Sequence, residues 1–366
     1  MIGWIVAGMV AVPTVSGFLF LRTEKFGALP QGDRLERIRQ SPHQKDGVFQ
    51  NMEPSEVMTS DESSLGMAGD FLFGDHPETI PQDSIPSVAT DLSALDGTQD
   101  LVVWFGHSSY LLQVGGVRFL VDPVFSGRAS PMPVGTKAFA GSDRFKASDM
   151  PHIDVLVITH DHWDHLDRET VTLLREKVDT VVCGLGVGAH LERWGYPSSK
   201  IVELDWNDSL SVSASVVLRA LPARHFSGRG LSRSRSLWCS FAVKSPQRSV
   251  YLGGDGGAGA HFVSIGKEHG PFDLAILEQG QYDSAWRNIH LLPQLLPRTM
   301  RELRASRLLP VHNSKFCISR HPWTEPLRLL QAGADSGGYG LLTPRIGEVA
   351  SLSDTTRREN WWLDLK

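Results

Sequence analysis

The stretch THDHWDH, residues 159–165, carries three histidines and two aspartates in seven positions. These are side chains that bind divalent metals, and so dense a cluster is rarely an accident of composition. Histidines two residues apart face different sides of a helix, whereas a tight loop can bring them together. The pattern predicts a buried strand over 155–159 and a helix over 167–177, capped by Asp167. The stretch therefore predicts a metal-binding loop between a strand and a helix.

Three further residues of ligand type follow apolar strands elsewhere in the chain. Asp255 follows residues 250–253, His312 follows residues 308–311, and His225 follows another long apolar stretch. One such residue is usually an ordinary polar loop residue, but three at the ends of strands indicate a shared site. Imidazole and carboxylate ligands predict two Zn²⁺ ions, with Mn²⁺ or Fe as alternatives. In the predicted arrangement His160, His162 and His225 hold one ion, Asp164, His165 and His312 hold the other, and Asp255 bridges them.

The rest of the chain alternates between apolar strands and helices. Strands dominate after residue 100, and helices join them from about residue 167. This order indicates two packed sheets with helices outside. The predicted helices cover 167–177, 187–194 and 293–305. The predicted strands cover 101–105, 110–114, 117–121, 155–159, 180–183, 211–221, 237–243, 250–253, 274–277 and 308–311.

Four of these stretches together resemble one family. THDHWDHLD at 159–167, the later His225, GGDGG at 253–257 and VHNSKF at 311–316 resemble the metallo-β-lactamase superfamily. The similarity is greatest to the branch of N-acylphosphatidylethanolamine-hydrolysing phospholipase D and ascorbate-6-phosphate lactonase. It runs from about residue 100 to 345 and includes FGHSSYLL, FLVDPVF and HPWTEP. The resemblance implies an α/β fold, an αββα sandwich with a dinuclear site at one sheet edge, and the same roles for the seven ligands.

Other residues are candidates for the surroundings of the metals. Asp122 can accept a hydrogen bond from a ligand imidazole, with a simple Asp-Pro turn as the alternative. His107 can orient a ligand, with a structural histidine as the alternative. Arg229 is one of five arginines, without an acid, between residues 219 and 235. Guanidinium groups beside a metal suit a phosphate, and a solvated loop is the alternative. His290, in NIHLLP, resembles a substrate-side histidine of the phospholipases.

The chemistry expected of such a centre is hydrolysis. Two metals close together lower the pKa of a bridging water, so that hydroxide attacks, and they hold both the attacking and the leaving oxygen. Asp164, Asp255 and His290 are the catalytic candidates, and Asp164 can pass a proton to the leaving group. The resemblance implies a zinc-dependent phosphodiesterase of phospholipase D type that acts on N-acylphosphatidylethanolamine-like lipids. A lactonase or an amidase with the same dinuclear site is the alternative.

Composition excludes several other classes of protein. The chain has 366 residues, of which 41% are hydrophobic and 21% charged, as in a folded protein. Its net charge of −5 argues against a nucleic-acid binder. Three scattered cysteines form neither a disulfide framework nor a zinc ribbon, which fits a reducing compartment. A diiron redox protein would prefer a carboxylate at His162, and a scaffold protein with a decayed site would have lost a ligand.

The N-terminal residues predict attachment to a membrane. Residues 2–21 carry no charge, and a helix of this length rises about 30 Å, the thickness of bilayer hydrocarbon. A signal peptide and a buried soluble helix are the alternatives, but no basic residue precedes the run and no clear cleavage site follows. Six basic residues between 22 and 45 place the catalytic domain on the cytoplasmic side of a bacterial-type inner membrane.

Four segments are expected along the chain. Residues 1–22 form a membrane anchor or an uncleaved signal, 23–99 an extension that is partly loop, 100–350 the hydrolase domain and 351–366 a tail. Between residues 46 and 100 there are twelve acids and no lysine or arginine, with many prolines and serines, which indicates a loop. The expected partners are a lipid or small anionic substrate, the membrane and, by resemblance, a second copy of the chain in a homodimer.

Overall fold

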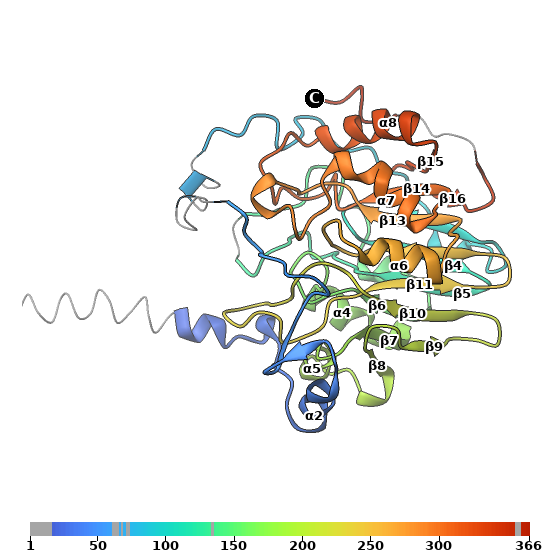
Figure 1. Cartoon of the computed structure of the whole chain (residues 1–366). Helices are drawn as coiled ribbons and strands as arrows, with labels where there is room; N and C mark the ends of the chain where they lie inside the picture. The colour runs from blue at the N-terminus through green and yellow to red at the C-terminus, as the bar shows by residue number, and fades with distance from the viewer. Residues whose placement is uncertain (1–16, 61–65, 67–68, 71–73, 133–134, 356–359) are drawn as a thin grey trace, which may run out of the picture.

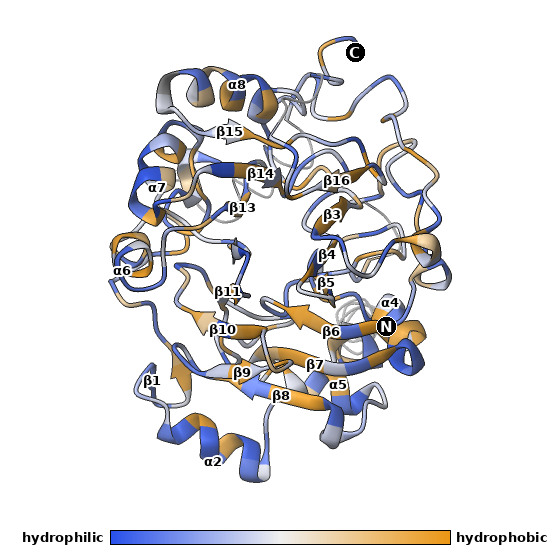
Figure 2. Ribbon diagram, turned by 90° about the vertical axis from the view of Figure 1, so that its right-hand side faces the viewer, coloured by the Kyte–Doolittle hydropathy of each residue, from blue (hydrophilic) through white to orange (hydrophobic). Residues whose placement is uncertain are grey.

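Two mixed β-sheets stacked face to face form the centre of the fold. The computed structural model describes residues 17–366, apart from 61–65, 67–68, 71–73, 133–134 and 356–359. Figure 2 shows α6 (His261–Glu268) and α7 (Leu296–Leu303) outside one sheet and α4 (Arg168–Leu174) outside the other. The predicted αββα arrangement is confirmed.

The first sheet is antiparallel on one side and parallel on the other. It contains β3 (Leu101–Trp104), β4 (Tyr110–Val114), β5 (Val117–Val121), β6 (Ile153–Ile158), β7 (Val178–Gly184), β8 (Ile201–Leu204) and β16 (Val349–Ser351). The strand order is β16-β3-β4-β5-β6-β7-β8. Neighbours run antiparallel from β16 to β5 and parallel from β5 to β8. The residues that follow β5 and β6 therefore lie at the same edge.

The second sheet repeats this plan. It contains β9 (Ser209–Ser211), β10 (Val217–Leu221), β11 (Ser240–Lys244), β12 (Ser249–Leu252), β13 (Leu274–Glu278), β14 (Arg307–Val311) and β15 (Gly340–Leu341). The strand order is β15-β14-β13-β12-β11-β10-β9. Strands β12 to β15 are parallel, and β10 shares their direction because β10 and β12 are both antiparallel to β11. The strands β10, β12, β13 and β14 thus end at one edge.

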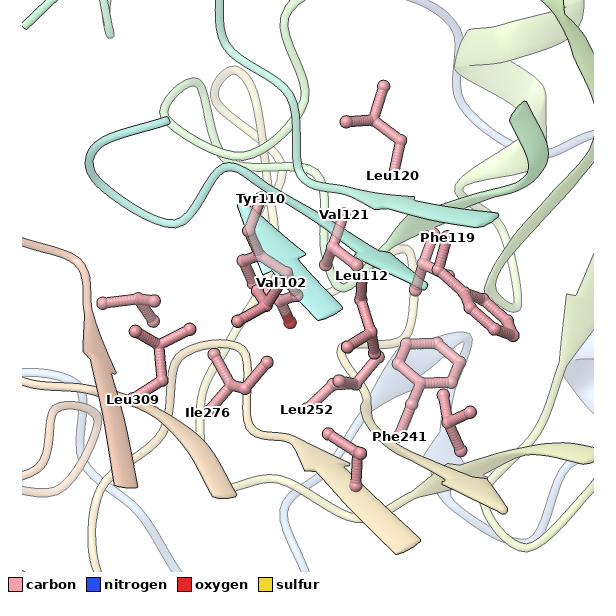
Figure 3. Packing of buried hydrophobic residues seen from close by; sticks show 14 of the residues in the cluster. Val102, Tyr110, Leu112, Phe119, Leu120, Val121, Phe241, Leu252, Ile276 and Leu309 are labelled. Carbon is pink, nitrogen blue, oxygen red and sulfur yellow. The ribbon is translucent and has the colours of Figure 1, made fainter. Parts of the chain in front are cut away.

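The core lies between the two sheets. In Figure 3, Leu112 and Phe119 of the first sheet face Phe241 and Leu252 of the second, whereas Leu120 points to the opposite face of β5. All five side chains are completely buried. Strands covered on both faces are apolar throughout, which is why their sequences are continuous apolar runs.

One predicted strand and several helices differ from the sequence-based expectation. The prediction of a single strand over 211–221 is wrong, because the Ser213 side chain accepts hydrogen bonds from nearby backbone amides and turns the chain between β9 and β10. The predicted helices correspond to α4, α5 (Gly188–Arg193) and α7. The helices α2 (Gly32–Gln40), α6 and α8 (Glu325–Gly337) were not predicted, because glycine and serine obscure the helical pattern of α6 and α8.

The segments on either side of the sandwich pack against it. Arg34 of α2 bonds the carboxylates of Glu192 and Glu203 at 2.7 and 2.6 Å. After α2, a short hairpin joins β1 (Gln44–Lys45) to β2 (Val48–Phe49). Near the other end of the chain, Trp362 is 1% exposed. The proposed segment boundaries themselves stay predictions.

The predicted membrane segment lies mostly outside the described residues, which begin at Gly17. Residues 17–21 are helical. Within the part of the chain that the structure describes, we find no helix with the length and apolar character needed to cross a bilayer. Part of the basic run after this segment is already engaged, since Arg34 and Arg37 both bond Glu203.

Candidate metal centre

Every predicted ligand lies at one edge of the sandwich, after a strand. His160 follows β6, His225 follows β10, Asp255 follows β12 and His312 follows β14. The remaining three ligands lie in the loop between β6 and α4. The ligands of the first sheet all follow β6, and the strands β10, β12 and β14 of the second sheet run in one direction, so that the carboxyl ends of these strands gather the side chains. The structure therefore brings all seven predicted ligands together.

Three imidazoles form a first group. His160 Nε2 and His225 Nε2 lie 2.9 and 3.1 Å from Nδ1 of His162. One nitrogen of each ring lies within 4.8 Å of the other two. His225 Nδ1 donates to the carbonyl of Ile289 at 2.7 Å, which leaves the lone pair of Nε2 for a cation. Three converging imidazoles are typical of a zinc site.

Asp164, His165 and His312 form a second group. Oδ2 of Asp164 lies 3.2 Å from His312 Nε2 and 3.5 Å from His165 Nε2. His107, which is completely buried, places its Nε2 2.9 Å from the same oxygen. His107 thus lies where the predicted orienting role requires it, in contact with a ligand carboxylate.

Asp255 reaches both groups with a single oxygen. Its Oδ2 lies 3.1 and 3.2 Å from Nε2 of His165 and His312, and 4.0 and 3.9 Å from Nε2 of His160 and His225. Two buried atoms here, His165 Nε2 and Asp255 Oδ1, make no hydrogen bond. Buried polar atoms normally have a partner. These unpaired atoms and converging nitrogens fit two cations bridged by Asp255.

Asp122 connects the two groups through ring nitrogens that do not face the metal centre. Its Oδ2 accepts hydrogen bonds from Nδ1 of His165 at 2.8 Å and from Oγ1 of Thr159 at 2.6 Å. The Thr159 hydroxyl lies 3.0 Å from Nδ1 of His160. Asp122 therefore orients His165 directly and His160 through Thr159, as the prediction of an acceptor for a ligand imidazole requires.

The backbone at the site is unusual. His107, Asp122 and His312 have φ angles of 51°, 41° and 66°, in the left-handed region that side chains rarely adopt. Gly254 has a φ of 59°, and a Cβ there would lie 2.9 Å from Cβ of Thr159. Such conformations cluster at functional sites, where the surrounding structure enforces them. The His312 amide, for example, donates to the carbonyl of His107 at 3.0 Å.

Burial and neighbouring charges give the ligand histidines of the two groups different pKa values. Burial lowers the pKa of His162 to about 4, and burial and neighbouring rings hold the pKa of His160 well below its ordinary value. Burial would also lower the pKa of His312, but Asp255 and Asp164 outweigh it and raise that pKa to about 10. The first group is thus neutral at pH 7 and ready to bind a cation, whereas a cation at the second group displaces a proton.

Glu278 is a further residue at the site that sequence reasoning missed. It ends β13, is 2% exposed, and accepts a hydrogen bond at Oε2 from Nδ1 of His290 at 2.6 Å. Its Oε1 accepts from two backbone amides at 2.8 and 2.9 Å. The His290 ring is thereby held 5.1 and 5.3 Å from the rings of His225 and His312. An acid at the end of the apolar strand LAILE was the available signal.

Asp161 of the ligand loop and Arg229 hold this loop in place through contacts with other parts of the protein. Asp161 is directed away from the ligand nitrogens, and its Oδ2 lies 3.1 Å from Nε2 of His190. Arg229 is 4% exposed and donates to the carbonyls of Asp161 and Leu166 at 3.0 and 2.6 Å. It also donates to the carbonyl of Lys25 at 3.1 Å. Arg229 is thus neither a solvated loop residue nor free to clamp a phosphate; its geometry is that of a residue that positions the ligand loop.

The interpretation of the arginine-rich stretch as a phosphate clamp is wrong for most of its members. Arg219, Arg224 and Arg235 use their guanidinium groups to bond other loops of the protein. Arg229 and Arg233 line the pocket over the ligands, and only the second of these two is exposed. The five arginines are close in sequence but not gathered at one site, because the path of β10 and the loop after it directs their side chains to different parts of the protein.

A pocket of about 480 Å³ opens above the ligands. His162, Asp164, Asp255 and His312 contribute to its lining, together with His290. The apolar part of the lining comes from Phe26, Val57, Met58, Ala129, Pro131, Trp163, Phe226, Trp286, Ile289 and Ile318. The pocket therefore combines a polar, ligand-rich region with a large apolar wall.

Comparison with known proteins agrees with this geometry. A family model described as "Beta-lactamase superfamily domain" matches residues 117–313. An uncharacterized protein of Mycobacterium tuberculosis is 39% identical over 328 residues, 88% of each chain. N-acyl-phosphatidylethanolamine-hydrolyzing phospholipase D 1 of Caenorhabditis elegans is 30% identical over 299 residues, 75% of this chain and 81% of that protein.

A solved structure shows the same fold. Igni18, a metallo hydrolase of Ignicoccus hospitalis, superposes with a TM-score of 0.55 at 20% identity, over 69% of this chain and 98% of that one. The family model and the relatives determine the membership, and the solved structure agrees with the fold. The chain belongs to the metallo-β-lactamase superfamily of metal-dependent hydrolases, in the branch that includes the N-acylphosphatidylethanolamine-hydrolysing phospholipases D.

Proposed function

We propose that this hydrolase binds two Zn²⁺ ions and cleaves phosphodiester bonds in N-acylphosphatidylethanolamine-like lipids. The pocket carries the proposal, because it joins a ligand-rich region to apolar walls. Such a pocket suits a substrate with an anionic headgroup and acyl chains. The name of the Caenorhabditis elegans relative supports the same reaction. When bound, two divalent cations would supply an activated water and neutralise charge on the phosphate.

The protein's own residues divide the remaining work. Burial would raise the pKa of Asp164, but His165, His107 and His312 hold it well below its usual range. Asp164 is therefore suited to binding a cation, more than to giving up a proton. The Nδ1 atom of His290 is engaged by Glu278, so its Nε2 is the nitrogen available to protonate a leaving oxygen.

The role of His290 has a specific test. His290→Ala should slow hydrolysis of a lipid phosphodiester by roughly 100-fold, and of bis(4-nitrophenyl) phosphate by less than about 10-fold, because 4-nitrophenolate leaves without a proton. His152→Ala, at an exposed histidine, is the matched control. Equal losses on both substrates would contradict the role of His290 as a proton donor.

The reaction itself is tested with the full-length, zinc-loaded protein. Release of phosphatidic acid from N-acylphosphatidylethanolamine is measured beside hydrolysis of bis(4-nitrophenyl) phosphate, with His162→Ala as the control. Turnover of the lipid that disappears in His162→Ala is the expected result. No turnover of either substrate, in protein that holds two metal ions, would overturn the phosphodiesterase proposal.

A lactonase or an amidase is the second candidate. The observation in its favour is that three of the five arginines between residues 219 and 235 do not line the metal pocket, whose walls are largely apolar. The same zinc-loaded protein, assayed on a series of lactones and N-acyl amides, distinguishes the two candidates. A preference for these substrates over phosphodiesters by kcat/KM would favour the second.

We also propose that residues 2–21 attach the enzyme to a membrane, with the catalytic domain on the cytoplasmic side of a bacterial-type inner membrane. The uncharged run and the basic residues after it support this topology. Protease protection in sealed membrane vesicles of known orientation tests it. The homodimer stays a prediction, for which light scattering of the purified protein is the test.

A further inference from the structure

Large apolar side chains are exposed beside the metal pocket. Leu231, in the loop at 228–235, is 88% exposed, and Phe18, Leu19 and Leu29 are 53%, 60% and 51% exposed. Phe18, Leu29 and Leu231 line a common hollow of about 310 Å³. Exposed apolar residues are usually scattered singly, and a contiguous group indicates a contact surface.

This hollow adjoins the metal pocket. Phe26, Gly228, Arg229 and Gly230 line both. The Phe26 ring lies 5.1 Å from the Trp163 ring in the ligand loop. The helical turn at 17–21, blue at the left of Figure 1, projects from the body of the protein at this side. A partner that covers the apolar surface therefore lies at the entrance to the metal pocket.

The same surface carries an excess of positive charge. Glu24, which lies among these residues, is already paired with Arg168 at 2.5 Å. Among the exposed charged side chains of residues 17–29 and of the linings of the hollow, the metal pocket and a neighbouring depression of about 450 Å³, four are basic and two, Glu24 and Glu169, are acidic. The four basic ones, none of which has an ion pair within the described part of the chain, are Arg22, Lys25, Arg233 and Arg235. The other acids of these linings are the buried Asp161, Asp167 and Asp255 and the predicted ligand Asp164. Because the whole chain has a net charge of −5, this excess is local. The partner is expected to be both apolar and negatively charged.

We propose that residues 17–29 and the loop at 228–235 together form a docking surface for a bilayer that contains anionic phospholipids. Apolar side chains enter the boundary between headgroups and acyl chains, while the basic groups meet lipid phosphates. The contact holds the mouth of the metal pocket against the lipid. This inference deepens the proposed function and rests on it for its purpose, but it adds a second contact, distant in sequence from the N-terminal run.

The contact is tested by fluorescence in the full-length protein. Leu231→Cys is labelled with an environment-sensitive nitrobenzoxadiazole group and mixed with phosphatidylcholine vesicles, with or without phosphatidylserine. Leu329→Cys, at an exposed leucine of α8, is the matched control, and the unsubstituted chain measures labelling of the three native cysteines. A blue shift at position 231, larger with phosphatidylserine and absent at position 329, is the expected result.

Two results of this experiment would overturn the proposal. One is the absence of a shift at position 231, whether or not the protein floats with the vesicles. The other is a shift that needs no lipid and grows with protein concentration, which would show that the surface binds a second copy of the chain.

Activity separates this inference from the proposed function. Leu231→Ser combined with Arg235→Ser should lower hydrolysis of lipid in anionic vesicles roughly tenfold, and leave bis(4-nitrophenyl) phosphate hydrolysis unchanged. Leu329→Ser combined with Arg328→Ser, on α8, is the control. Unchanged vesicle activity in the first variant would contradict the docking surface. If the unsubstituted protein hydrolyses no phosphodiester, the proposed function fails, and the fluorescence experiment alone decides the docking surface.

Discussion

Substitution of Asp122 by asparagine should weaken metal binding without removing a metal ligand. Oδ2 of Asp122 accepts from His165 Nδ1 at 2.8 Å and from Thr159 Oγ1 at 2.6 Å. An asparagine places either an amide NH₂ or an uncharged oxygen at this point. The charge-assisted bond to His165 is thereby lost, at about 1.5–3 kcal/mol. This energy corresponds to roughly 10- to 100-fold in metal affinity at the group that contains His165.

Competition with a chromogenic chelator measures both affinities in one zinc titration. Asp122→Asn should weaken the His165 group by the stated factor and the His160 group by less, since His160 is held only through Thr159. Thr159→Val is the matched control, because it keeps the shape and the backbone bond to Asp122 and should affect the His160 group alone. Two affinities within about twofold of the unsubstituted protein would refute the argument that Asp122 orients the ligands.

Three further predictions concern stability. Arg229→Met keeps the stem but leaves the carbonyls of Asp161 and Leu166 without their donor, so it should lower the free energy of unfolding by about 2–4 kcal/mol; an unchanged urea midpoint would contradict this. Trp362→Ala should lower the free energy of unfolding by about 3–5 kcal/mol because the indole is buried. Leu363→Ala, at a neighbour that is 56% exposed, should change it by no more than about 0.5 kcal/mol. Equal calorimetric Tm values for the two variants would show that residues near the C-terminus do not contribute to the core. In the metal-free protein, burial lowers the pKa of His162 to about 4 and that of His107 to about 3, so the unfolded chain binds more protons and Tm should fall as the pH falls from about 6.5 to 4. His312, whose pKa is raised to about 10, contributes stability that is complete below about pH 6.5 and is lost as the pH rises toward 10. A plot of Tm against pH without a maximum near pH 6.5 would contradict this prediction.

The ligand set was predictable because its signals are local. His160 and His162 lie in one dense motif, and Asp255 and His312 stand directly after apolar strands. Parallel strands within each sheet then bring their ends to one edge, so the position of each residue at a strand end determined its place in the fold. The same reasoning predicted the two sheets, whose buried strands are long apolar runs.

Other features depend on contacts that the sequence does not encode locally. From the sequence, Glu278 is only the last residue of a strand. The folded structure is needed to show that it accepts a hydrogen bond from His290. The left-handed backbone at His107 is fixed by its hydrogen bonds with the 312–313 turn. Arg224 and Arg229 are five residues apart in sequence, yet they bond different loops. Spacing along an irregular loop therefore predicted a cluster of five arginines at the phosphate site, whereas the fold leaves only Arg229 and Arg233 in the lining of the metal pocket.

Metal stoichiometry tests the central claim most directly. The full-length protein, saturated with zinc and freed of excess, is measured by plasma mass spectrometry beside His225→Ala and the exposed control His152→Ala. We expect two zinc ions per chain in the unsubstituted protein and in His152→Ala. We expect one in His225→Ala, because the second group keeps Asp164, His165, His312 and Asp255. A single ion in the unsubstituted protein, or two in His225→Ala, would contradict a dinuclear centre built from these seven residues.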